Sequence, residues 1–294
     1  MLPANGVTSS IEDKLFPQKY TLQIKGRLFH WEKPQIMGIL NSTPDSFFDK
    51  SRVKAEKNII LKKAEEMIQQ GASILDIGGY SSRPGASEVS VEEELNRVIQ
   101  PVIWINKEFP EVLISIDSFR SRVAKEAVEA GAHLVNDISG GELDKDMFGT
   151  VAQLNVPYIM MHMRGNPATM QTKTNYSDIL VEILNYFAEK LDVIRKFGIK
   201  DVIIDPGFGF AKNLEQNYFL LRNLDYLKAL GLPVLVGLSR KSMIYKTLDC
   251  DSSEALNGTT ALNMVALLKG ANILRVHDVK EANETLKLYK QLYP

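Results

Sequence analysis

The stretch Gln35-Ile-Met-Gly-Ile-Leu-Asn41 decides the fold, because it is nearly all apolar and ends in a polar side chain. A short, almost uninterrupted apolar run of this kind is typical of a strand buried on both faces of a parallel sheet. Similar runs recur along the rest of the chain. They are Ser73–Gly79, Val112–Asp117, His133–Ser139, Pro157–His162, Val202–Gly207, Pro233–Ser239 and Ile273–Asp278.

Longer stretches with helical periodicity separate these runs. The predicted helices are Ala55–Gly71, Val91–Phe109, Arg120–Ala130, Asp144–Leu154, Tyr176–Phe197, Leu214–Leu230, Glu254–Lys269 and Val279–Leu292. The first run begins at residue 35 and the last at residue 273, so the unit repeats about every 34 residues, the size of a βα unit. Eight units predict an α/β protein with a (β/α)8 TIM barrel. A doubly wound open sheet is the alternative, but the glycine fingerprint of its dinucleotide-binding form is missing after the first strand.

Two runs precede the barrel and alternate about Lys25-Gly26, which predicts a β-hairpin of Tyr20–Ile24 and Arg27–Trp31. We expect residues 1–34 to form an N-terminal extension whose hairpin caps the lower end of the barrel. Residues 35–294 would then form the barrel as one domain. No stretch rich in Pro, Gly or Ser divides the chain further.

The composition excludes several classes of protein. The hydrophobic fraction is 45% and the net charge is −1, which argues against disorder and against a general binder of nucleic acid or membrane surfaces. No apolar run has the roughly 20 residues of a membrane span. The sole cysteine, Cys250, rules out an intrachain disulfide, so a cytoplasmic location is expected.

Polar side chains follow every predicted strand, at the end of a barrel where active sites lie. One set offers mainly acceptors, suited to an N–H-rich heterocycle or to Mg²⁺: Asp76, Asp117, Asn136, Asp137 and Asp205. A second set offers positive charge, suited to phosphate: Arg83, Arg240, Lys241, Arg275 and His277. The two sets predict an enzyme acting on a small, polar, phosphorylated substrate.

The strings at the strand ends go further, since their ordered set resembles the dihydropteroate synthase family from about residue 35 to residue 280. They are Ile39-Leu-Asn-Ser-Thr-Pro-Asp-Ser-Phe47, Asp76-Ile-Gly-Gly-Tyr-Ser-Ser-Arg-Pro-Gly85, Ser115-Ile-Asp-Ser118, Asn136-Asp-Ile-Ser-Gly-Gly141, Met161-His-Met-Arg-Gly-Asn-Pro167, Asp205-Pro-Gly-Phe-Gly-Phe210, Gly237-Leu-Ser-Arg-Lys-Ser242 and Arg275-Val-His-Asp278. The resemblance implies condensation of 6-hydroxymethyl-7,8-dihydropterin diphosphate with 4-aminobenzoate, which gives dihydropteroate and diphosphate in folate biosynthesis.

The resemblance also implies roles for individual residues. Pterin contacts would come from Asp117, Asn136, Asp205 and Lys241, with Met161 and Phe210 around the ring and Ser82 and Gly237 in the same substrate site. Arg275 and His277 would hold the diphosphate and, with Lys241, serve catalysis, while Asn41 would bind Mg²⁺. The aminobenzoate pocket, a target of sulfonamides in this family, would involve Thr43, Pro44, Phe47, Ser82, Arg83, Pro84 and Ser239.

Three departures from the family pattern affect the first two loops. Phe48-Asp49-Lys50-Ser51 replaces the usual Ser-Asp-Gly-Gly, Tyr80 replaces a common Glu, and Ser42 replaces Val. They leave the loop conformation and the sulfonamide sensitivity open.

Two other functions stay in view. One is a pterin-binding methyltransferase, which would not need the Arg275 and His277 set; the other is an inactive pterin-binding protein, which would be expected to lose Asn41, Arg275 or His277. The resemblance further implies a homodimer, to which the apolar stretch Leu262–Leu268 could contribute.

Overall fold

A computed structural model describes residues 20–24, 26–41, 50–80 and 89–293, without the side chains of residues 50–55. The first described element is an antiparallel hairpin of β1 (Tyr20–Ile24) and β2 (Arg27–Trp31), as predicted. Gly26 lies between them with a φ of 73°, a left-handed conformation that glycine adopts without steric cost.

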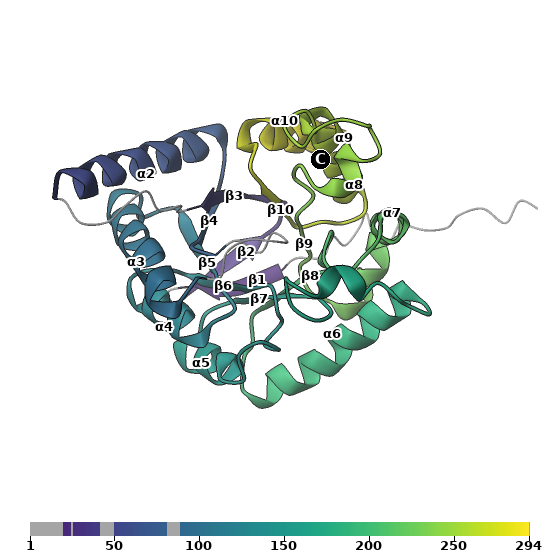
Figure 1. Cartoon of the computed structure of the whole chain (residues 1–294), viewed down its shortest axis with the longest axis horizontal. Coiled ribbons are helices and arrows are strands. Elements are labelled where there is room, and N and C mark those ends of the chain that lie inside the picture. Colours follow the sequence, from purple (N-terminus) through teal and green to yellow (C-terminus); the bar gives the residue numbers. More distant parts are fainter. Residues whose placement is uncertain (1–19, 25, 42–49, 81–88, 294) are drawn as a thin grey trace, which may run out of the picture.

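Eight parallel strands then alternate with helices around a central ring (Figure 1). The strands are β3 (Gln35–Asn41), β4 (Ile74–Gly78), β5 (Leu113–Asp117), β6 (Leu134–Asp137), β7 (Tyr158–Met161), β8 (Val202–Asp205), β9 (Leu235–Val236) and β10 (Ile273–Val276). The helices are α2 (Lys50–Gln70), α3 (Val91–Glu108), α4 (Ser121–Glu129), α5 (Met147–Leu154), η1 (Met170–Thr172), α6 (Ile179–Lys196), α7 (Leu214–Arg222), η2 (Leu224–Leu230), α8 (Ser242–Tyr245), α9 (Leu256–Leu268) and α10 (Val279–Leu292).

The order of strands in the sheet is β8-β7-β6-β5-β4-β3-β10-β9. An isolated parallel bridge between Ile204 and Val234 joins its two edges, and the Ile204 amide donates to the Pro233 carbonyl over 3.0 Å. The predicted TIM barrel is therefore confirmed, with a short β9 at its seam.

The strand alternation divides the apolar side chains into two clusters, because successive residues point to opposite faces. Outward side chains such as Ile77, Ile116 and Val135 pack under the helices. One inward residue from each strand joins a separate cluster, which we call the floor ring. It consists of Met37, Ile74, Leu113, Leu134, Ile159, Ile203, Leu235 and Ile273.

The hairpin packs directly on the floor ring. Leu22, Ile24 and Trp31 belong to the same cluster and are at most 7% exposed, while Phe29 packs at its margin. The Gln23 amide also donates to the Asp201 carboxylate over 3.2 Å, just before β8. These contacts close the barrel at the amino-terminal ends of its strands.

One predicted helix is divided in the structure, and one short α-helix was not predicted. The stretch Leu214–Leu230 forms α7 and then the 3-10 helix η2, with Asn223 in a non-helical conformation between them. The short helix α8 was not predicted from the sequence, and it follows Lys241 directly. Among the described residues, no helix is long and apolar enough to cross a membrane.

Candidate active site

The floor ring locates the site, because the residue two positions further along each strand points into the same barrel interior. We call these residues the upper ring. It consists of Ile39, Asp76, Ser115, Asn136, Met161, Asp205, Gly237 and Arg275. The family resemblance assigns a role in the site to five of them, which are Asn136, Met161, Asp205, Gly237 and Arg275, and a sixth, Asp76, belongs to the predicted acceptor set. The barrel thus changes from an apolar floor to a charged interior within two residues.

Arg275 lies at the centre of the charged network. Its Nε donates to Asp76 Oδ2 over 2.6 Å, and its Nη2 donates to Asp117 Oδ2. Asn136 Nδ2 donates to the same Asp76 oxygen over 3.0 Å. Burial lowers the pKa of the Arg275 guanidinium, but the two carboxylates raise it by more, so they hold Arg275 protonated.

Asp76 is fully buried, and its second carboxylate oxygen, Oδ1, has no hydrogen-bond partner among the described residues. A buried acceptor of this kind is costly unless a ligand or water satisfies it. Burial raises the pKa of the neighbouring Asp117, Arg275 opposes this, and the Asp76 carboxylate adds to it. This side of the site therefore has acceptors ready for a ligand that brings N–H groups.

Asp205 and Lys241 form the opposite side. The Gly207 amide donates to Asp205 Oδ1 over 2.8 Å, and Lys241 Nζ donates to the Phe208 carbonyl and lies 4.9 Å from the centre of the Phe210 ring. Burial raises the pKa of Asp205, which Lys241 partly opposes. Burial lowers the pKa of Lys241 to about 8, against the attraction of Asp205.

A buried lysine, Lys212, lies behind this pair and was not predicted from the sequence. It is 4% exposed, and burial lowers its pKa to about 7, which Asp205 partly opposes. Lys212 follows the end of β8 by seven residues, so strand alternation does not reach it. The sequence feature that could have pointed to Lys212 is its place two residues after the string Asp205-Pro-Gly-Phe-Gly-Phe210.

An apolar cluster lies beside the polar groups. Met161 belongs to it and Phe210 packs against it, and both were predicted to surround the heterocycle. The other members are Ile138, Met163, Met170 and Ala211, with Phe119 packed against them. A flat aromatic ligand could therefore contact apolar side chains while its edge reaches the polar ones.

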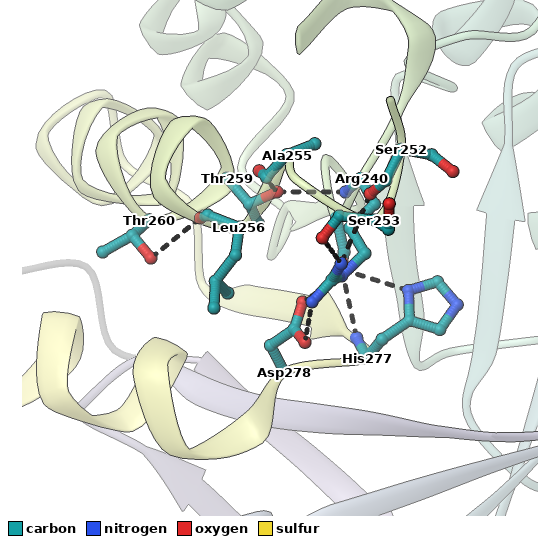
Figure 2. A network of polar contacts seen from close by, with 10 residues as sticks. Arg240, Ser252, Ser253, Ala255, Leu256, Thr259, Thr260, His277 and Asp278 are labelled. Atoms are coloured by element: carbon teal, nitrogen blue, oxygen red, sulfur yellow. Dashed lines mark hydrogen bonds and ion pairs between the residues drawn. The ribbon is translucent and has the colours of Figure 1, made fainter. Parts of the chain in front are cut away.

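Arg240 has a bracing role in the structure, although it was grouped with the phosphate-binding cations. Its Nε and one terminal nitrogen each donate to Asp278 over 2.9 Å, and another terminal nitrogen donates to the Ser253 carbonyl (Figure 2). Its own amide donates to Thr259 Oγ1 over 3.0 Å, and its φ is 53°. Arg240 therefore ties the loop after β9 to α9 and to the start of α10, while the next residue, Lys241, enters the site.

Ser239 and His277 meet beside this brace. The Ser239 hydroxyl lies 3.0 Å from His277 Nδ1 and accepts the His277 amide over 3.2 Å. Asp137, in contrast, faces away from the interior: it accepts the Tyr158 hydroxyl over 2.7 Å and the Ser139 and Gly141 amides. Asp137 thus holds the loop after β6 in place.

The remaining predicted residues belong to the first two loops. Thr43, Pro44, Phe47, Ser82, Arg83 and Pro84 lie outside the described residues. Asn41 is exposed at the end of β3, where it is paired in register with Gly78, the neighbour of Asp117. Within the part of the chain that the structure describes, no three His, Cys, Asp or Glu side chains are grouped to hold a metal ion.

Comparisons with known proteins agree with this geometry. Residues 37–277 match the family model described as "Pterin binding enzyme". A dihydropteroate synthase of Synechocystis sp. is 46% identical over 276 residues, covering 92% of this chain and 95% of the relative. A crystal structure of the Yersinia pestis dihydropteroate synthase with a sulfonamide drug complex has a TM-score of 0.85 and 38% identity, covering 93% and 98%. A Xanthomonas albilineans dihydropteroate synthase with 4-aminobenzoic acid has a TM-score of 0.83 and 36% identity, covering 92% and 97%.

Proposed function

The chain belongs to the pterin-binding enzyme family, and we propose that it catalyses the dihydropteroate synthase reaction of folate biosynthesis. In this transferase reaction, 6-hydroxymethyl-7,8-dihydropterin diphosphate and 4-aminobenzoate give 7,8-dihydropteroate and diphosphate. The observation that carries the proposal is the division of the barrel interior. Carboxylate acceptors for a heterocycle and cations for a diphosphate occur there within hydrogen-bond distance of each other.

The pterin end of the substrate suits the acceptors. A pterin has a guanidine-like N–H edge, which carboxylates such as Asp117 and Asp205 can accept, and a carbonyl that the Lys241 ammonium can reach. Asn136 offers both a donor and an acceptor. The adjoining apolar cluster, with Met161 and Phe210, suits the faces of the ring.

The diphosphate end suits Arg275 and His277. A guanidinium has five N–H donors, and Asp76 and Asp117 engage two of its nitrogens, so further donors remain for an anion. His277 stands two residues further along the same strand direction, so it adds an imidazole ring toward the mouth of the barrel.

The chain's own residues would act chiefly by positioning and by charge stabilisation. The methylene carbon–oxygen bond breaks and its electron pair leaves with the diphosphate, whose developing charge Arg275 and His277 stabilise. The amine nitrogen of aminobenzoate then bonds to the methylene carbon and loses a proton to solvent. An aromatic amine needs no strongly activated base for this step.

Mg²⁺ is part of the proposal. The residues fit an ion held mainly by the substrate, because Mg²⁺ commonly binds one or two protein oxygens together with substrate phosphates and water. Asn41 offers such an oxygen at the exposed end of β3, and the described residues provide no closed metal cage. When bound there, Mg²⁺ would neutralise diphosphate charge.

The test is incubation of the purified chain with the pterin diphosphate, 4-aminobenzoate and Mg²⁺. We expect diphosphate release that depends on the amine, together with dihydropteroate formation. Omission of Mg²⁺ should lower the rate. Diphosphate release that is absent, or independent of the amine, would reject the synthase activity.

We also propose three further properties on the basis of family membership. The chain would form a homodimer through the region of α9, where Leu268 is 48% exposed and Leu262 and Val265 are half-buried. It would work in the cytoplasm, and its aminobenzoate pocket would bind sulfonamides. Light scattering after gel filtration, cell fractionation and sulfonamide competition against aminobenzoate test these statements in turn.

A further inference from the structure

Lys212 is a buried lysine whose amine is held by protein groups around the loop after β8. Its Nζ contacts His162 Nδ1, the Gly207 carbonyl and the Phe210 carbonyl, each over 3.0 Å. His162 is itself 3% exposed, and burial lowers its pKa well below the usual range, so its ring is neutral. When the Lys212 amine is protonated it can only donate, so Nδ1 of His162 then accepts and the ring proton of His162 is on Nε2.

These contacts join the end of β7 to the loop that follows β8. At Gly207 the two backbones lie so close that an added Cβ would stand 2.1 Å from the His162 carbonyl oxygen. The φ of Gly207 is 71°, a conformation that favours glycine. Further along the loop, the Gly209 amide donates to Asn217 Oδ1 over 2.7 Å, and Asn217 Nδ2 donates back to the Lys212 carbonyl over 3.2 Å.

The same loop, residues 205–212, presents three groups of the proposed pterin site. Its Gly207 amide fixes the Asp205 carboxylate, its Phe208 carbonyl accepts Lys241 Nζ, and its Phe210 ring lies beneath that ammonium. Lys212 Nζ donates to the Gly207 carbonyl, before Phe208, and to the Phe210 carbonyl, two residues after it. A change at Lys212 therefore reaches Asp205 and Lys241 through the loop backbone.

We propose that Lys212 is a positioning residue for the pterin subsite, acting through the loop after β8. The inference rests on the proposed function, since it assigns that loop to the pterin end of the substrate. The Lys212 ammonium fixes the loop so that Asp205, Lys241 and Phe210 face the same ring. The aminobenzoate end of the substrate pair, which the resemblance assigns to Ser239 and the first two loops, does not depend on Lys212.

The test compares Lys212→Met, which removes all donors, with Lys212→Gln, which keeps two N–H groups on a shorter side chain. Lys196→Met, at an exposed site in α6, is the matched control. Kinetics with both substrates are combined with calorimetry using 6-hydroxymethylpterin, which measures the pterin site without turnover. Thermal unfolding identifies the folded variants.

We expect Lys212→Met to raise the KM for the pterin diphosphate and the Kd for hydroxymethylpterin about tenfold or more, with the aminobenzoate KM within twofold. Lys212→Gln should give an intermediate effect, and Lys196→Met none. An unchanged pterin Kd in Lys212→Gln, or an equal loss for both substrates, would overturn the inference, even if Lys212→Met does not fold. Absent turnover by the parent chain would instead reject the proposed function, while the pterin Kd would still test Lys212.

Discussion

The floor ring and the upper ring stand two residues apart on the same eight strands, yet the floor ring stabilises the fold and the upper ring holds polar groups for chemistry. The floor ring is apolar and sealed by the hairpin, so its burial stabilises the fold. The upper ring buries Asp76, Asn136 and Asp205, which costs free energy unless each group is paired. The comparison teaches that strand alternation separates stability from chemistry at neighbouring positions of one strand.

The largest expected effect comes from removing the central cation of the upper ring. Arg275→Ala leaves Asp76 and Asp117 unpaired and removes donors for the diphosphate. Removing one donor to the negative charge that develops in a transition state typically costs about 10²–10³-fold in rate, so we expect kcat/KM to fall by at least about 10²-fold. Steady-state kinetics measure this, and Arg195→Ala, at an exposed site, is the control. Turnover that survives Arg275→Ala would mean that Arg275 does not stabilise the leaving diphosphate.

The next largest effect is a loss of stability where the hairpin packs on the floor ring. Trp31→Ala should lower the free energy of unfolding by about 3–5 kcal/mol, because a large buried aromatic is replaced by a cavity. The kcat/KM of the remaining folded protein should change less than twofold. Leu28→Ala, on the same hairpin but 66% exposed, should cost under about 0.5 kcal/mol. Denaturant unfolding measures both, and equal losses would contradict the packing of the hairpin on the floor ring.

A smaller effect is expected at the brace outside the two rings. Arg240→Ala breaks the paired contact with Asp278 and should destabilise the protein by about 1–2 kcal/mol. The kcat should fall several-fold, because the neighbouring Lys241 is less well held. Asp278→Asn should reproduce a part of both losses. If kcat falls as far in Arg240→Ala as in Arg275→Ala, Arg240 contacts substrate and is more than a brace.

The smallest effect at neutral pH concerns Lys241. The Lys241 pKa is lowered to about 8, so the ammonium donor is present below that pH and is lost as the pH rises through it. We expect kcat/KM for the pterin diphosphate to fall above about pH 8. In Lys241→Arg the falling limb should move to higher pH, because a guanidinium stays charged. A pH profile measures this, and an unmoved limb would assign the titration to another group.

Much of the barrel could be predicted from the sequence, since each strand is an apolar run and the hairpin alternates about Lys25-Gly26. The same alternation that places Met37 and Ile273 in the floor ring places Ile39 and Arg275 in the upper ring. Three details depended on tertiary contacts. Helix α8 has only the local pattern Ser242–Tyr245, the break at Asn223 divides one apolar stretch, and β9 has few paired residues.

For the site, the residue types in the sequence predicted where a side chain lies better than they predicted which group it contacts. Arg240 and Arg275 have the same charge, but Arg275 lies within β10 and points into the barrel, whereas Arg240 follows β9, has a positive φ and contacts Asp278. Lys212 escaped prediction because its acceptors are largely backbone carbonyls, which no side-chain motif records. The sequence motifs thus located the pocket, whereas the bracing contacts around it required the fold.

The floor ring also has a consequence for the order of folding. The hairpin precedes the barrel in the sequence, but the surface that buries Leu22, Ile24 and Trp31 includes Ile273 from the last strand. Those side chains therefore stay solvent-exposed until the ring of strands has assembled across some 250 residues. During synthesis, the apolar face of the hairpin is thus uncovered until the carboxyl-terminal strand arrives, and exposed apolar surface of this kind favours aggregation.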